Sequence, residues 1–153
     1  MIGGSGTVTT IYSDDEEVFV GGDFSCQLPD GTTGHAVVVY SKKNQNWYEI
    51  GIPNTINSGG NGYLINSFSV NSINGSSILA IGGYFTFSAG GFDYNSLALY
   101  NLDQDRWVSV GISLLGNTQI SEVLLNSTGV MYMAGEFDVN FILFSSNLSF
   151  LRI

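Results

Sequence analysis

The feature that most constrains this chain is a sequence motif, or shared phrase, that occurs three times. It consists of a short apolar run, then small residues, an acidic or aromatic residue, and Phe. The copies are Val18–Phe24, Leu79–Phe85 and Met131–Phe137. Repetition at a spacing of roughly 50 to 60 residues is typical of repeat architectures, in which similar units stack on one another. We therefore expect three units, at approximately 7–51, 64–111 and 119–153.

Each unit is expected to hold four strands, because its apolar runs are short, rich in Val, Ile, Leu and aromatics, and bounded by Gly, Asn, Ser and Asp. The first and second strands are expected at Val8–Tyr12, Ile65–Val70 and Ile120–Leu125, and at Glu17–Gly22, Ile78–Gly83 and Val130–Gly135. The third and fourth are expected at Ala36–Ser41, Ser96–Asn101 and Asn140–Ser145, and at Asn46–Ile50, Arg106–Val110 and Leu148–Arg152. Long connections are expected at Ser25–His35, Ile52–Leu64, Phe87–Asn95 and Ile112–Thr118.

Consecutive apolar residues in the second and third strands, as in Val37–Tyr40 and Leu97–Tyr100, indicate sheets covered on both faces. A sheet between two similar sheets is the environment of a propeller blade. The predicted fold is therefore all-β, a propeller segment of about three four-stranded antiparallel blades. Glycine suits a strand that another backbone approaches closely or that carries a bulge, which explains Gly21, Gly22, Gly82, Gly83 and Gly135.

An aromatic pair follows the glycines at identical spacing in two units, Tyr40 with Trp47 and Tyr100 with Trp107. We interpret these rings as packing between blades. The Gly-Gly, Tyr and Trp pattern resembles the kelch repeat, and with the Phe and a closing Trp-x-x-x-Gly it is similar to the propeller repeats of Rax2-like cell-surface proteins. The resemblance implies an extracellular or cell-surface propeller protein. An intracellular kelch-type adaptor is the alternative.

Three blades do not complete a propeller, which closes with about 4 to 8. Each open blade face covers about 380 Å². Leaving it in water forfeits up to roughly 9 kcal/mol at about 25 cal/mol per Å², against a domain stability of about 5–15 kcal/mol. We expect a protein partner to close the ring, either the remainder of a longer propeller chain or identical copies, and favour the longer chain.

Composition limits the partners and the chemistry. The chain has 4 Lys and Arg against 13 Asp and Glu, a net charge of −9, which disfavours nucleic acid and anionic membranes. No apolar run is long enough to insert in a membrane. One cysteine, Cys26, one histidine, His35, and the acidic run Asp14–Glu17 lack the clustering or spacing of metal sites. We therefore expect no metal, no cofactor and no enzyme activity.

Function is expected on the loops. The long connections share one end of the blades, where Tyr63, Phe87, Phe92 and Tyr94 either fill the blade tops or form a protein or glycan contact surface. The sequons at Asn74, Asn126 and Asn147 fall on the opposite end. The sequence predicts a propeller module for adhesion, structural assembly or protein–protein interaction. The alternative is a lectin-like propeller that binds a ligand through the long loops.

Overall fold

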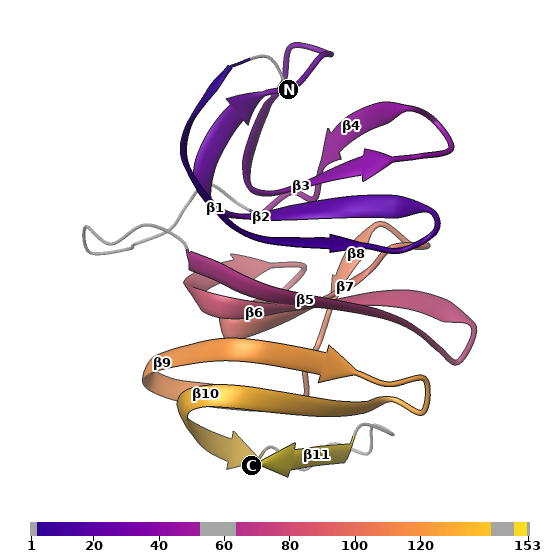
Figure 1. Cartoon of the computed structure of the whole chain (residues 1–153). Helices are drawn as coiled ribbons and strands as arrows, with labels where there is room; N and C mark the ends of the chain where they lie inside the picture. The colour runs from indigo at the N-terminus through magenta and orange to yellow at the C-terminus, as the bar shows by residue number, and fades with distance from the viewer. Residues whose placement is uncertain (1–2, 53–63, 142–148, 153) are drawn as a thin grey trace.

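The computed structural model describes residues 3–52, 64–141 and 149–152, which form strands and turns without a helix (Figure 1). The strands make three sheets, two of four strands and one of three. The first sheet contains β1 (Gly4–Ser13), β2 (Glu17–Gln27), β3 (Thr33–Ser41) and β4 (Asn46–Glu49). The second contains β5 (Leu64–Ile73), β6 (Ser76–Ala89), β7 (Phe92–Asn101) and β8 (Arg106–Val108). These antiparallel sheets confirm the all-β class and give a fold of partial-propeller character.

The third sheet contains β9 (Ile112–Leu125), β10 (Val130–Phe141) and β11 (Ser149–Arg152), in the order β11-β10-β9. Four antiparallel strands were the expectation for this unit. Instead, β11 pairs in parallel with β10, from Val130 opposite Ser149 to Met133 opposite Arg152. This unit lacks the Tyr–Trp pair that joins the third and fourth strands of the other two sheets. Strand β11 pairs directly with the edge of β10 that the third strand occupies in those sheets. The predicted strand Asn140–Ser145 is described only as far as Phe141, where β10 ends.

Most of the predicted long connections are strands. Ser25–His35 includes the ends of β2 and β3, and Phe87–Asn95 includes the ends of β6 and β7. Pairing resumes after a register shift, and the second hairpin turns at Gly90 and Gly91, both with positive φ. Ile112–Thr118 lies within β9. Of Ile52–Leu64, residues 53–63 lie outside the described part. Residues 28–32 of the first segment are a loop as expected. The loop expectation was wrong for the rest of that segment and for the other two described segments, because pairing extends beyond the apolar runs.

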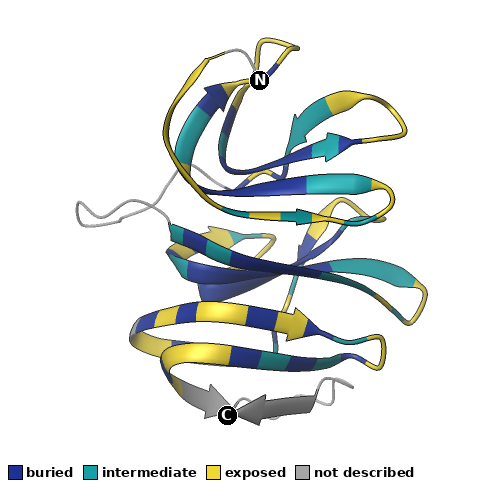
Figure 2. Ribbon diagram, in the orientation of Figure 1, coloured by how far each residue is buried: buried dark blue, intermediate teal, exposed yellow. Residues whose placement is uncertain are grey.

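The sheets stack in chain order (Figure 1). We call the packed interface between two neighbouring sheets a joint. We call the side facing the preceding sheet the front face, and the side facing the following sheet the rear face. In the first joint β5 packs on β1 and β2, and in the second β9 packs on β5, β6 and β7. The middle sheet is therefore buried on both faces, as its continuous apolar runs predicted (Figure 2).

The glycine pair has two separate tasks. A Cβ at Gly21 would lie 2.5 Å from Cζ of Phe68, and one at Gly82 would lie 2.7 Å from Cγ2 of Ile120, in each case a side chain of the next sheet. The first glycine therefore lets neighbouring sheets approach. A Cβ at Gly22 or Gly83 would instead meet the backbone of the first strand of its own sheet. There the register shifts by one residue, as in a β-bulge.

Candidate functional site

One copy of the repeated Tyr–Trp pair lies in the joint between the first and second sheets. Tyr100 and Trp107 lie opposite each other on β7 and β8, with ring centroids 4.9 Å apart, and both are buried. The Trp107 indole N–H donates to the carbonyl oxygen of Gly51, which belongs to the first unit, at 3.3 Å. Tyr40 and Trp47 repeat the pair at 5.2 Å on the first sheet, where they are only half-buried. The Tyr100–Trp107 pair is thus covered by the first unit, whereas no described sheet covers Tyr40 and Trp47.

Three of the predicted interaction aromatics are described, and two of them lie inside the protein. Phe87 stacks on Tyr94 with centroids 4.8 Å apart and meets the edge of Trp107 at 4.7 Å. The Tyr94 hydroxyl donates to the carbonyl oxygen of Val108 at 3.2 Å, and burial raises the pKa of Tyr94 to about 12. Phe92 is 41 % exposed, and Tyr63 lies outside the described residues. The rings of Phe87 and Tyr94 therefore fill the blade, which leaves Phe92 as the described candidate for ligand contact.

The sequons differ in accessibility. Asn74 is exposed in the turn between β5 and β6, with φ of 51°, and is followed by Gly75 in the same left-handed region. The Asn126 side-chain oxygen accepts hydrogen bonds from the backbone N–H groups of Thr128 at 3.0 Å and Val130 at 2.9 Å, so this side chain organises its own turn. Asn147 lies outside the described residues. Asn74 is thus the sequon best placed for modification.

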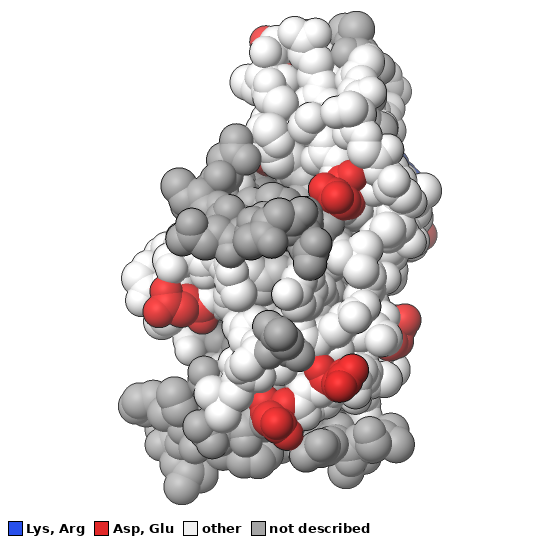
Figure 3. All heavy atoms as spheres, turned by 90° about the vertical axis from the view of Figure 1, so that its left-hand side faces the viewer, with Lys and Arg blue, Asp and Glu red and all other residues white. Residues whose placement is uncertain are grey.

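The acidic and sulfur-bearing side chains serve local structure. The Asp14 carboxylate accepts hydrogen bonds from the backbone N–H groups of Glu16 and Glu17, both at 2.8 Å. The Glu17 carboxylate accepts a hydrogen bond from the Tyr48 hydroxyl. Burial raises the pKa of the Glu17 carboxyl and of the Cys26 thiol. Within residues 3–52, 64–141 and 149–152, no three potential ligands gather to hold a metal ion. Acidic side chains are spread singly over one face of the molecule (Figure 3).

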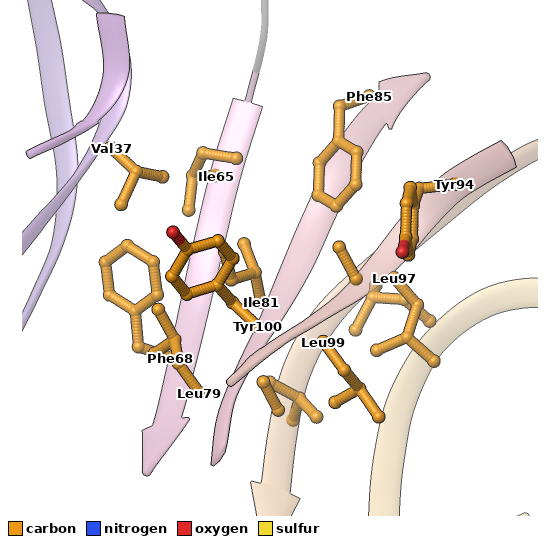
Figure 4. Close-up of a cluster of buried hydrophobic side chains, with 14 of the residues drawn as sticks. Val37, Ile65, Phe68, Leu79, Ile81, Phe85, Tyr94, Leu97, Leu99 and Tyr100 are labelled. Carbon is orange, nitrogen blue, oxygen red and sulfur yellow. The ribbon is translucent and has the colours of Figure 1, made fainter. Parts of the chain in front are cut away.

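The front face of the first sheet is an apolar surface whose side chains sequence reasoning did not identify. Ile65 and Phe68 of β5 are 0 % and 6 % exposed, because they pack against the rear of the first sheet, near Val37 (Figure 4). Val8 and Ile11 of β1 hold the same positions in the repeat, yet they are 47 % and 65 % exposed. Alignment of the units around the bulges is the signal that finds them.

The rear face of the third sheet is open in the same way. Ala134 stands where the first two units have Gly21 and Gly82, and it is exposed, whereas both glycines are buried under the next sheet. Leu124 of β9, 57 % exposed, lies on the same face beside Tyr132 of β10, its direct cross-strand partner. The molecule therefore ends in two incomplete joints, one at each end of the stack.

No family model, curated protein or solved structure matches this chain. Among the described residues, none belongs to a helix long and apolar enough to cross a membrane.

Proposed function

We propose that this chain is a non-enzymatic, kelch-like propeller module of a secreted or cell-surface protein, and that its task is structural assembly, adhesion or protein–protein interaction. The observation that carries the proposal is the pair of incomplete joints. Val8 and Ile11 are apolar side chains in water at positions that are buried in both following units. Exposed apolar surface of this kind marks a site for a protein partner.

The location rests on two features. The sequence phrase resembles repeats of cell-surface propellers, and Asn74, the exposed sequon, lies in a β5–β6 turn where a glycan has room. A Cβ at the adjacent Gly75 would meet nothing within 4 Å, so the turn projects freely. A glycan at this turn would leave both end faces uncovered, which is compatible with assembly.

Photo-cross-linking tests the interaction role. The photoreactive residue p-benzoylphenylalanine replaces Ile11, which lies on the open front face, in the protein as its producing cells make it. Phe92 receives the same replacement as the matched control, because it is an exposed apolar residue of the second sheet. We expect a discrete cross-linked protein product from position 11, with the partner peptide identified by mass spectrometry. Equal, diffuse labelling from both positions would contradict an interaction role for this face.

The cellular location needs a separate test. Expression behind a secretory leader in a eukaryotic host should give folded protein whose mass falls on treatment with N-glycosidase. Asn74→Gln should remove one glycan. Secreted, folded protein with Asn74 unmodified would leave the extracellular assignment without its structural support.

The alternative, a lectin-like module, has less support. A surface that stacks on sugars needs exposed aromatic rings. Of the predicted aromatic residues that the structure describes, Phe92 is exposed, whereas Phe87 and Tyr94 are only 5 % and 3 % exposed. A glycan array tests it directly: specific binding that Phe92→Ala abolishes would favour ligand recognition over assembly. Tyr94→Ala is not a suitable variant, because removal of a buried ring would disturb the fold.

A further inference from the structure

We propose that the open rear face of the third sheet binds the open front face of the first sheet in a second copy of this chain, and that two copies close into one ring of six sheets. This inference rests on the proposed assembly role and names the partner. It follows from the recurrence of one joint within the chain.

The apolar part of the joint is repeated closely. At the first joint Ile65 and Phe68 project over Gly21, and Phe68 meets Phe19 with ring centroids 6.1 Å apart. At the second joint the corresponding pair, Ile120 and Val123, projects over Gly82. Both pairs come from the first strand of the following sheet. A third joint of this kind would set the first strand of another sheet over Ala134.

Polar contacts repeat as well. The bulged residue of the first strand bonds the next sheet: the Thr9 hydroxyl donates to the carbonyl oxygen of Ile65, and the Asn66 amide donates to that of Ile120 at 2.8 Å. Ser121 holds the bulge position in the third sheet and is exposed. Its hydroxyl is placed to bond the corresponding carbonyl of a further sheet, which is that of Val8.

The two open faces supply opposite halves of this joint. The rear half presents Leu124, Tyr132 and Ala134, where the first sheet has Tyr12, Phe19 and Gly21. The front half presents Val8 and Ile11, which correspond to Ile65 and Phe68. We therefore expect Ile11 to lie against Tyr132, as Phe68 lies against Phe19.

The front half also carries an unused donor. The Trp107 indole donates to Gly51 of the preceding unit, whereas the described part of the chain provides no acceptor for the half-buried indole of Trp47. Beside it lies a small apolar cluster that belongs to the first sheet alone, with Val20 and Val38 at its centre. A preceding sheet would complete this face.

Charge and area favour a second copy. Strand β1 carries no charged residue, and Glu122 of β9 already accepts a hydrogen bond from Ser67 at 2.7 Å within the second joint. Neither β1 nor Glu122 therefore brings an unpaired charge to the new joint, whereas Glu136 and Asp138 of β10 are exposed acidic residues of the third sheet. One joint buries about 760 Å² over both faces, and the two joints of a closed pair bury about 1,500 Å². That area is typical of stable complexes, whereas a single joint is at the size of a crystal contact, near 800 Å².

The test is the mass of the chain in solution by sedimentation velocity, over a range of concentrations. We expect twice the mass of one chain for the unaltered protein. Ile11→Glu on the front face and Leu124→Glu on the rear face should each give monomers, with the dissociation constant raised by at least about 30-fold. Phe92→Glu, a matched change of an exposed apolar residue outside both faces, should remain a dimer.

Mixing the two disrupted variants tests the head-to-tail geometry. Ile11→Glu retains an intact rear face and Leu124→Glu retains an intact front face, so one intact joint should form between them. We expect a weaker one-to-one complex that does not grow further. If the sheets instead met front to front, Leu124→Glu alone would dimerise and mixing would restore nothing.

Folding is controlled with circular dichroism and urea unfolding, and Ile11→Ser and Leu124→Ser repeat the test without a charge. A monomer at about 100 μM would overturn the proposal, because two joints of this area should associate more tightly. An assembly larger than two copies would overturn the closed ring. A monomer in solution together with a specific cross-link from position 11 to another protein would overturn this inference and leave the proposed function in place.

Discussion

Replacing Gly82 by alanine tests whether close approach of the sheets is the reason for the repeated glycine. The added methyl would lie 2.7 Å from Cγ2 of Ile120 and 3.4 Å from Cγ1 of Val123. Gly82 does not have positive φ, so backbone strain makes no contribution. Overpacking of this kind costs about 1–3 kcal/mol. For a chain of this size each kcal/mol lowers the midpoint of thermal unfolding by about 2–4 °C.

A double-mutant cycle separates the contact from other effects of the substitution. Ile120→Ala removes the atom that the new methyl would meet, at a cost of about 2–5 kcal/mol for the cavity. In the double variant the alanine methyl at position 82 occupies part of that cavity. We expect urea unfolding to show a double variant at least about 1 kcal/mol more stable than the sum of the two single changes predicts.

Two other glycines provide the controls. Gly51→Ala should change stability little, because its Cβ would meet nothing within 4 Å. Gly83→Ala should be the most destabilising, because its Cβ would meet the carbonyl oxygen of Leu64, which is backbone and cannot rotate away. Additive effects at positions 82 and 120, or equal losses at all three glycines, would refute the assignment of the first glycine to the joint.

Three further predictions concern buried groups. Trp107→Phe should cost about 1–2 kcal/mol in urea unfolding, and more than Trp47→Phe, because Trp107 alone has its indole N–H bonded across a joint. Burial raises the pKa of Glu17, so its contribution to stability is present below the ordinary glutamate pKa and is lost as pH rises through the raised value. Glu17→Gln should reduce the fall of the urea midpoint as pH rises above the ordinary glutamate pKa and through the raised value, while keeping an acceptor for Tyr48. Cys26 is buried with a raised pKa, and should react with a thiol reagent at least about tenfold more slowly folded than in urea.

The sequence predicted the parts of the fold that depend on repetition. The glycines of the shared phrase and the continuous apolar runs indicated sheets that are covered on both faces. The structure gives each a physical cause: Gly82 lies under Ile120, and Leu79, Ile81, Leu97 and Leu99 bury the two faces of the middle sheet (Figure 4). These features could be predicted because the same joint occurs twice in the chain and requires the same residue types at corresponding positions of two units.

The extensions of the β2–β3 and β6–β7 hairpins could not be predicted in this way. Three residues of β2 stand opposite one residue of β3, where Ala36 has φ of 54°, and Ser96 repeats this conformation in β7 with φ of 60°. Alanine and serine rarely adopt positive φ, so neither residue indicates it in a sequence as glycine does. The polar and small residues around the bulge therefore suggested a loop. Alternation in Phe85-Thr86-Phe87-Ser88 was the signal for continued pairing.

The open faces could be predicted only in part. Sequence reasoning required bare faces at both ends of three blades, but it could not say which side chains form them. Val8 and Ile11 look like ordinary strand residues until the one-residue bulge at Thr9 is known, because that bulge sets which side chains face the preceding sheet. A shift of one residue in a strand moves every following side chain to the other face.

The third sheet shows which part of the unit the stack requires. Its outer strand β11 pairs in parallel with β10, unlike the third strands of the other sheets, yet Ile120 and Val123 are as deeply buried as Ile65 and Phe68. The joint is made chiefly by the first strand of the following sheet, which packs over the inner strands of the preceding one. Outer strands can therefore vary without loss of the joint, and selection on assembly should act on the first strand, its bulge and the residue at the first glycine position. By this reasoning Ala134 is the weakest position of the proposed ring, since its methyl must be accommodated where Gly21 and Gly82 leave space.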